Sequence, residues 1–121
     1  MNEYGSKIWM IGDGYYPADS VGMKSHESVC VLNTTQTPAQ LKLTLYFEDR
    51  PPLTGFAYTV QAQRCAHIRM DALKNGVGEG VPMDVPYAIL VESDTPVAVQ
   101  YSRMDTRQAE MALMTTLGYA L

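Results

Sequence analysis

Six strongly polar side chains follow directly on an apolar strand pattern near the C-terminal end of the sequence. The pattern opens with Val97 and Val99 on one side and Ala98 on the other, which is typical of a β-strand. The residues that follow, named here the C-terminal polar cluster, are Gln100, Arg103, Asp105, Arg107, Gln108 and Glu110. Burying charge is unfavourable unless the charge is paired. The cluster is therefore expected to be either a closed structural network or a ligand site.

The residues of this cluster leave both interpretations open. Arg103 and Asp105 share one face of the expected strand, so an internal ion pair between them is the simplest structural explanation. The cluster nevertheless holds more polar capacity than one ion pair needs. Planar guanidinium and amide groups are also the groups with which proteins hold hydroxyl-rich or anionic ligands.

Two shorter groupings could contribute to such a site. Ser25, His26 and Glu27 stand just before another expected strand. His26 beside the Glu27 carboxylate could bind a polar ligand, or Ser25 and Glu27 could form local backbone hydrogen bonds in a turn. His67 and Arg69 lie on the strand face opposite Ile68, which is expected to be either solvated or a recognition surface. The candidate ligand-binding residues are His26, Glu27, His67, Arg69, Gln100, Arg103, Asp105, Arg107 and Gln108.

The same residue types do not indicate catalysis or a metal centre. Cys30, Cys65, His26 and His67 lack the Cys-x₂₋₄-Cys or His-x₃₋₅-His spacing that is usual in zinc sites. No nucleophile with an evident base and no phosphate-binding loop accompanies the polar cluster. We therefore expect a recognition protein that is not an enzyme and needs no cofactor. Both thiols lie in strand-like segments, and we expect them to be reduced and packed.

Composition and charge narrow the class of protein further. At 121 residues the chain is expected to form one domain, residues 1–121, and 46% apolar with 18% charged residues is ordinary for a globular protein. A net charge of −4 with scattered basic residues makes binding to nucleic acid an unlikely function. No apolar run is long enough to cross a membrane, and no apolar signal core begins the sequence, so a cytoplasmic location is expected.

Period-two alternation dominates the pattern along the chain. It is clearest at Leu41, Leu43, Leu45 and Phe47, which alternate with polar or aromatic partners. Strands are expected at 7–12, 27–34, 41–48, 56–60, 64–70, 87–92 and 97–104, with a tight turn at 93–96 that contains Pro96 and separates the last two. Short strands at close spacing predict an all-β, single-domain β-sandwich of mostly antiparallel strands.

The segment at 105–120 supports two interpretations. Asp105 followed by Gln108 resembles a helix capping box, and Ala109, Ala112 and Leu113 would share a helical face. Residues 111–119 also alternate as a strand would. We favour one short helical turn near 106–110 followed by a strand, because the Thr115–Thr116 pair and Gly118 weaken a helix.

Several longer motifs resemble a known family. They are Trp9, Gly14-Tyr15-Tyr16-Pro17, the run from Ser25 to Asn33, Arg64 with His67-Ile68-Arg69, the run from Gln100 to Glu110, and Leu117-Gly118-Tyr119-Ala120. These blocks stand in the order found in the sensory rhodopsin transducer family, which the sequence closely resembles over almost its whole length.

The resemblance implies a small cytoplasmic β-sandwich that assembles as a cyclic homotetramer. Its fold is similar to that of carbohydrate-binding modules, so the favoured function is a sensor or signalling domain for a small molecule, a sugar or related metabolite. The alternative is a protein-interaction transducer that relays a signal from a membrane photoreceptor, a sensory rhodopsin. In either case we expect the protein not to insert into the membrane.

Overall fold

The computed structural model describes residues 4–18, 25–107 and 112–121. These residues form eight strands and no helix, so the predicted all-β class is confirmed. The strands are β1 (Ser6–Gly14), β2 (His26–Asn33), β3 (Ala39–Phe47), β4 (Leu53–Val60), β5 (Arg64–Arg69), β6 (Tyr87–Asp105), β7 (Ala112–Leu117) and β8 (Tyr119–Ala120). Within this described part, nothing forms a helix of the length and apolarity that crossing a bilayer requires.

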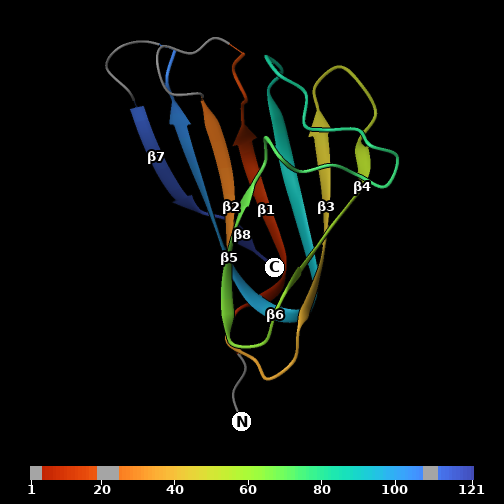
Figure 1. Ribbon diagram of the computed structural model, residues 1–121, viewed down its shortest axis with the longest axis vertical. Helices are drawn as coiled ribbons and strands as arrows, with labels where there is room; N and C mark the ends of the chain where they lie inside the picture. Colours follow the sequence, from red (N-terminus) through yellow and green to blue (C-terminus); the bar gives the residue numbers. More distant parts are fainter. Residues whose placement is uncertain (1–3, 19–24, 108–111) are drawn as a thin grey trace.

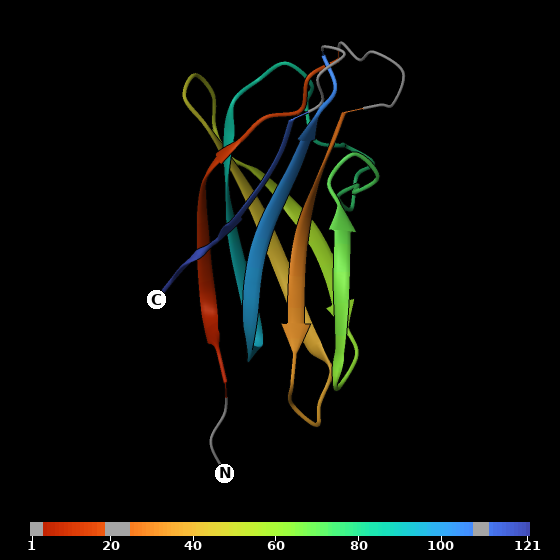
Figure 2. The same ribbon diagram turned by 90° about the vertical axis from the view of Figure 1, so that its left-hand side faces the viewer.

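The strands form two antiparallel layers that share β6 (Figures 1 and 2). One layer has the order β4-β3-β6-β1-β8. In the other, β6 lies between β7 and β2, and β2 pairs on its far side with β5. The first half of β6 pairs with β1 and β3, and its second half pairs with β2 and β7. The layers therefore make a β-sandwich with one strand common to both.

Strand β6 differs from what the sequence predicted. Residues 93–96 were expected to be a turn that separates two strands, but the strand continues without a break over 19 residues. These residues instead form the bend at which β6 leaves one layer, reverses its direction and enters the other (Figure 2). The predicted break in the strand is therefore wrong. Ser93 still pairs with Leu41, and Val97 still pairs with Ser6. As a result, both ends of β6 lie at the same end of the sandwich.

The core lies between the layers, and the period-two pattern correctly identifies much of it. Leu41, Leu43 and Leu45 are each no more than 1% exposed, and they face valines of the other layer's inner side such as Val29 and Val31 in one apolar cluster. Alternation in β2 and β6 means that every second residue points into this core. At the end of the sandwich where both ends of β6 lie, the inward-pointing residues of β2 and β6 are Glu27 and Tyr101 instead of valines, and the candidate site begins there.

The C-terminal segment is a strand, as favoured, but it does not stay in one layer. β7 pairs with β6, whereas β8 pairs with β1, and the chain changes layers at Gly118. A Cβ atom at Gly118 would lie 3.2 Å from the Trp9 ring, so this crossing favours glycine. The helical turn expected near 106–110 is not seen at Thr106 or Arg107, and residues 108–110 lie outside the described residues.

The prediction that both cysteines are reduced and packed is wrong about the packing of Cys65. Cys30 is half-buried and Cys65 is exposed, and neither forms a disulfide. Their apolar neighbours Val29, Val31 and Ile68 point inward, so alternation directs the thiols to the outer face. Cys30 lies opposite His67, and Cys65 lies opposite Leu32. This diagonal arrangement separates the two thiol positions by about 7–8 Å between their backbones, which is too far for an unstrained disulfide.

We expect the two thiols to differ in reactivity in the folded protein. Cys65 should react with a thiol reagent nearly as fast in the native protein as after denaturation, because its side chain is exposed. Cys30 should react several-fold more slowly, because its side chain is partly covered. Stopped-flow labelling of Cys30→Ser and Cys65→Ser would assign each rate. Equal, slow native rates for both would contradict the outward orientation of Cys65.

Candidate functional site

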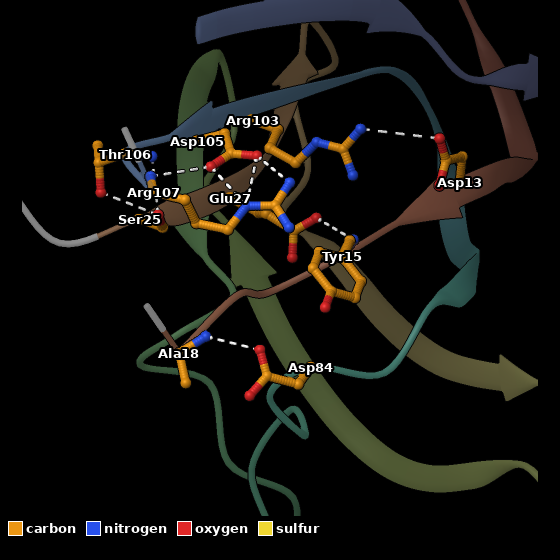
Figure 3. A network of polar contacts seen from close by, with 10 residues as sticks. All are labelled: Asp13, Tyr15, Ala18, Ser25, Glu27, Asp84, Arg103, Asp105, Thr106 and Arg107. Atoms are coloured by element: carbon orange, nitrogen blue, oxygen red, sulfur yellow. Dashed lines mark hydrogen bonds and ion pairs between the residues drawn. The ribbon is translucent and has the colours of Figure 1, made fainter. Parts of the chain in front are cut away.

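A buried carboxylate, that of Glu27, lies at the end of the sandwich where both ends of β6 meet. Glu27 occupies an inward position of β2 and is only 1% exposed. Its Oε1 accepts a hydrogen bond of 2.5 Å from the Tyr87 hydroxyl, and its Oε2 accepts one from the Tyr101 hydroxyl. The backbone N–H of Tyr15 donates to Oε2 at 2.7 Å (Figure 3). One carboxylate therefore links β2, both halves of β6 and the segment after β1.

Burial governs the proton affinity of this carboxyl group. Removal from water raises the pKa of Glu27 to about 7, although the hydrogen bonds from Tyr87 and Tyr15 and the charge of Arg103 act in the opposite direction. The charge of Asp13 adds a small further increase to that pKa. Burial and the Glu27 charge also raise the pKa of the Tyr87 phenol, which therefore remains a hydrogen-bond donor. The Glu27 carboxyl group can therefore gain or lose a proton near neutral pH.

Two ion pairs surround this carboxylate. Arg103 lies 3.7 Å from Asp13, and Arg107 contacts Asp105 through a 2.5 Å ion pair (Figure 3). The Arg107 guanidinium also lies 5.4 Å from the centre of the Tyr15 ring, a cation–π contact. Hydrogen bonding from Arg107 holds the pKa of Asp105 below its usual value. The predicted pair of Arg103 with Asp105 is replaced by these pairings. Asp105 instead meets Arg107, its neighbour two residues on, and Arg103 meets Asp13 at the end of β1, which the pattern of β6 alone does not place.

A pair of buried hydroxyl groups closes the same end of the structure. Ser25 Oγ and Thr106 Oγ1 lie 2.9 Å apart, and the Thr106 backbone N–H donates to Ser25 Oγ at 2.9 Å. Both residues are fully buried. They join the residue before β2 to the residue after β6, as Figure 3 shows.

The alternative that Glu27 only forms local turn hydrogen bonds is wrong, because its partners are Tyr15, Tyr87 and Tyr101.

A pocket of about 430 Å³ opens beside this network. Its lining residues are Gly12, Asp13, Tyr46, Phe47, Glu48, Pro86, Tyr87 and Ala88. Asp13 and Tyr87 belong to both the pocket and the network, since Asp13 pairs with Arg103 and Tyr87 donates to Glu27. A molecule in the pocket would therefore lie one side chain away from the buried carboxylate.

The structure divides the predicted site residues into two groups on opposite faces of one layer. Glu27, Arg103, Asp105 and Arg107 are gathered at the end of the sandwich. His26, His67, Arg69 and Gln100 occupy outward positions of β2, β5 and β6. His67 and Gln100 line a shallow outer groove of about 270 Å³, together with both cysteines. Gln108 lies outside the described residues.

Sequence reasoning missed four residues of the network: Asp13, Tyr15, Tyr87 and Tyr101. Tyr101 had a usable signal, because it continues the inward row of Val97 and Val99 and a buried phenol needs a hydrogen-bond partner. Asp13 and Tyr15 come from the end of β1 and the residue just after it, and no periodic pattern places them.

Among the described residues, no group of three or more His, Cys, Asp or Glu side chains could hold a metal ion.

Comparison with known proteins identifies the family. The family model described as Anabaena sensory rhodopsin transducer matches residues 4–120. The chain belongs to the Anabaena sensory rhodopsin transducer family. This result confirms the resemblance inferred from the Ser25–Asn33 and Gln100–Glu110 runs, which contain Glu27, Tyr101 and Arg103.

Two solved structures are similar to this member of the transducer family. The crystal structure of Thermotoga maritima 1070 shares 36% identity and a TM-score of 0.87, and the match covers 100% of this chain and 97% of that one. The structure of the Anabaena sensory rhodopsin transducer shares 34% identity and a TM-score of 0.77, covering 90% and 96%. A comparison with curated proteins gave no match.

We expect Glu27 to make the stability of this transducer-family protein fall as pH rises. Its folded pKa of about 7 lies above the ordinary value of 4.5, so between these two pH values the folded state binds a proton that the unfolded state has released. The stabilising contribution is complete below about pH 4.5 and is lost as pH rises to about 7, a change of about 3 kcal/mol.

Chemical denaturation of the wild type and of Glu27→Gln across this pH range measures the effect. Because Gln does not titrate, the stability advantage of the wild type over the variant should shrink as pH rises. Glu92→Gln, an exposed carboxylate on the outer face, serves as the control for a general change of net charge. Parallel pH profiles for the wild type and Glu27→Gln would show that burial does not raise the pKa of Glu27.

Proposed function

We propose that this transducer-family domain is a sensor that binds a small polar molecule, a sugar or related metabolite, in the pocket beside Glu27. The observation that carries the proposal is the double role of Tyr87, which lines the pocket and whose hydroxyl donates to Glu27. A ligand that contacts Tyr87 would act on a hydrogen bond that joins both layers. Binding could in this way change the state of the whole sandwich, as a signalling domain requires.

The composition of the pocket supports a sugar-like ligand. Tyr46, Phe47 and Tyr87 supply aromatic surface, and Asp13 and Glu48 supply acceptors for hydroxyl donors. Binding sites for small molecules typically combine such apolar walls with a few polar groups, and a volume of about 430 Å³ falls within their usual range. The C-terminal polar cluster contributes indirectly, since Arg103 positions Asp13. The proposal includes that the domain acts in the cytoplasm and that it signals without catalysing a reaction.

Exposed apolar side chains favour a second candidate, a protein-interaction transducer. Ile8, Met10 and Tyr119 lie on the outer face of the layer that contains β1 and β8. Leu113 and Leu117 are 69% and 72% exposed on β7, at the edge of the other layer. Exposed apolar and aromatic groups of this kind are common at protein interfaces. They support assembly as a homotetramer and contact with a signalling partner such as a membrane photoreceptor.

A thermal-shift screen with mono- and disaccharides and polyols would test the sensor proposal. A ligand that binds only the folded state should add about 2.7 kcal/mol of stability when present at about 100 times its Kd. Tyr46→Ala should remove this shift, because Tyr46 forms a wall of the pocket.

Tyr58→Ala is a matched control, since Tyr58 is similarly exposed, at 38% against 45% for Tyr46, and lines none of the pockets described here. Binding that survives Tyr46→Ala would place the ligand elsewhere. A screen in which no sugar or polyol raises the Tm would contradict the sensor proposal.

Light scattering in dilute solution would test the predicted assembly. We expect a particle with four times the protomer mass of 13.4 kDa, because the sequence contains eight tyrosines among eleven aromatic residues and many apolar side chains are exposed. A monodisperse particle of 13.4 kDa would contradict the homotetramer.

A further inference from the structure

We infer that the pocket beside Glu27 selects a positively charged ligand, a hydroxylated amine of the amino-sugar class, over neutral or anionic sugars. This inference rests on the proposed function and specifies the ligand class of the same pocket. It is carried by two independent features of the pocket lining, namely its ionised side chains and its aromatic rings.

The ionised side chains of the lining are both acidic. Asp13 and Glu48 line the pocket, and among the residues that the structure describes neither a lysine nor an arginine does. Glu48 has no hydrogen-bond or ion-pair partner within the part of the chain that the structure describes. The Asp13 side chain is 76% exposed and meets Arg103 only at 3.7 Å. Both carboxylates can therefore accept hydrogen bonds from an ammonium group, and such charge-assisted hydrogen bonds are stronger than neutral ones.

The aromatic lining attracts the same type of group. The faces of Tyr46, Phe47 and Tyr87 carry partial negative charge and favour cations over anions. One of these rings already has a cation on it, since the Arg50 guanidinium lies 5.3 Å from the centre of the Phe47 ring. Arg50 does not line the pocket beside Glu27, and its guanidinium pairs with Asp49 at 3.0 Å. It therefore leaves the charge of Glu48 unbalanced, whereas Asp13 shares its charge with Arg103 at 3.7 Å.

The surroundings of the pocket strengthen this preference. An adjoining cavity of about 420 Å³ shares Glu48 and Pro86 with the pocket and adds Asp49, Arg50 and Asp84. Carboxylates thus outnumber guanidinium groups along the whole opening, and clefts with one sign of charge concentrate ions of the opposite sign. A phosphorylated or acidic sugar would meet no basic side chain in the lining of the pocket beside Glu27.

Isothermal titration calorimetry with four related sugars would test the inference. Glucosamine, glucose, N-acetylglucosamine and glucose 6-phosphate differ mainly in the charge and size of one substituent. At about pH 6 the amine is protonated. We expect glucosamine to bind about tenfold more tightly than glucose or N-acetylglucosamine at about 0.02 M salt, and this ratio to fall at about 0.15 M salt as screening increases. Glucose 6-phosphate should bind most weakly.

Two variants separate a contact in the pocket from a general effect of net charge. Glu48→Gln removes one lining carboxylate and should reduce the glucosamine preference to about threefold or less. Glu92→Gln makes the same change of net charge on the outer face of β6, opposite Ile8 and Lys42, and should leave the preference unchanged.

The outcomes separate the inference from the proposal on which it rests. Neutral sugars that bind as tightly as glucosamine, or glucose 6-phosphate as the tightest ligand, would overturn the charge selectivity while the sensor function stands. A preference unchanged in Glu48→Gln, or lost equally in Glu92→Gln, would also overturn it. Absence of binding by all four sugars would overturn the inference about amino sugars, whereas the sensor function fails only if the wider screen of sugars and polyols also gives no shift of the Tm.

Discussion

Strand β6 imposes the constraint on which the rest of the structure depends. It pairs with β1 and β3 in one layer and with β2 and β7 in the other, so neither layer is complete without it. At its bend, Ser93 Oγ exchanges hydrogen bonds with the backbone of Thr95, and Asp94 accepts one from the Gln40 N–H. Pro96 has no N–H to satisfy. Local side-chain contacts thus replace ladder hydrogen bonds where the strand changes layers.

The bend determines what meets at the opposite end of the sandwich. Because β6 reverses, Tyr87 near its start and Tyr101 near its end approach one carboxylate, that of Glu27. Burying Glu27 is unfavourable, and three donors offset only part of the loss of hydration, since its pKa remains raised to about 7. Neutral phenols supply most of these contacts, so within the described residues the carboxylate is held in place without a direct ion pair, and its pKa stays near 7.

The sequence predicts local properties of this fold well and long-range ones poorly. Alternation correctly identified the buried face of β3 at Leu41, Leu43 and Leu45, because each side chain's direction depends only on its place in the strand. It could not identify the layer exchange of β6, which depends on pairing with Ser6 and Leu41 far away in the chain. The cysteines show the same limit, since apolar neighbours suggested burial although period two directs the thiols outward.

The candidate site was half predictable for the same reason. Glu27, Arg103, Asp105 and Arg107 lie in conspicuous polar runs, so sequence alone identified them, but it could not assign their partners. Arg103 and Asp105 share a strand face and yet do not pair with each other. Arg103 meets Asp13 because the ends of β1 and β6 come together in the folded sandwich, and Asp105 meets Arg107 two residues further along the chain. His67 and Gln100 have equally polar side chains but occupy outward rows, which separates them from the buried network.

The positions of the pocket and of the exposed apolar side chains bear on how a transducer-family domain could contact a ligand and a protein at once. The pocket lies at one end of the sandwich and is lined by residues of β1, β3 and β6, whereas the exposed side chains of β7 lie at the edge of the other layer. Ligand binding and a protein contact through β7 therefore need not compete for the same surface. Glu27 stands between them, because the hydrogen bonds that it accepts reach the pocket through Tyr87 and the strand paired with β7 through Tyr101. A continuous path of hydrogen bonds thus joins Tyr87, through one carboxylate, to the part of β6 that pairs with the edge strand β7.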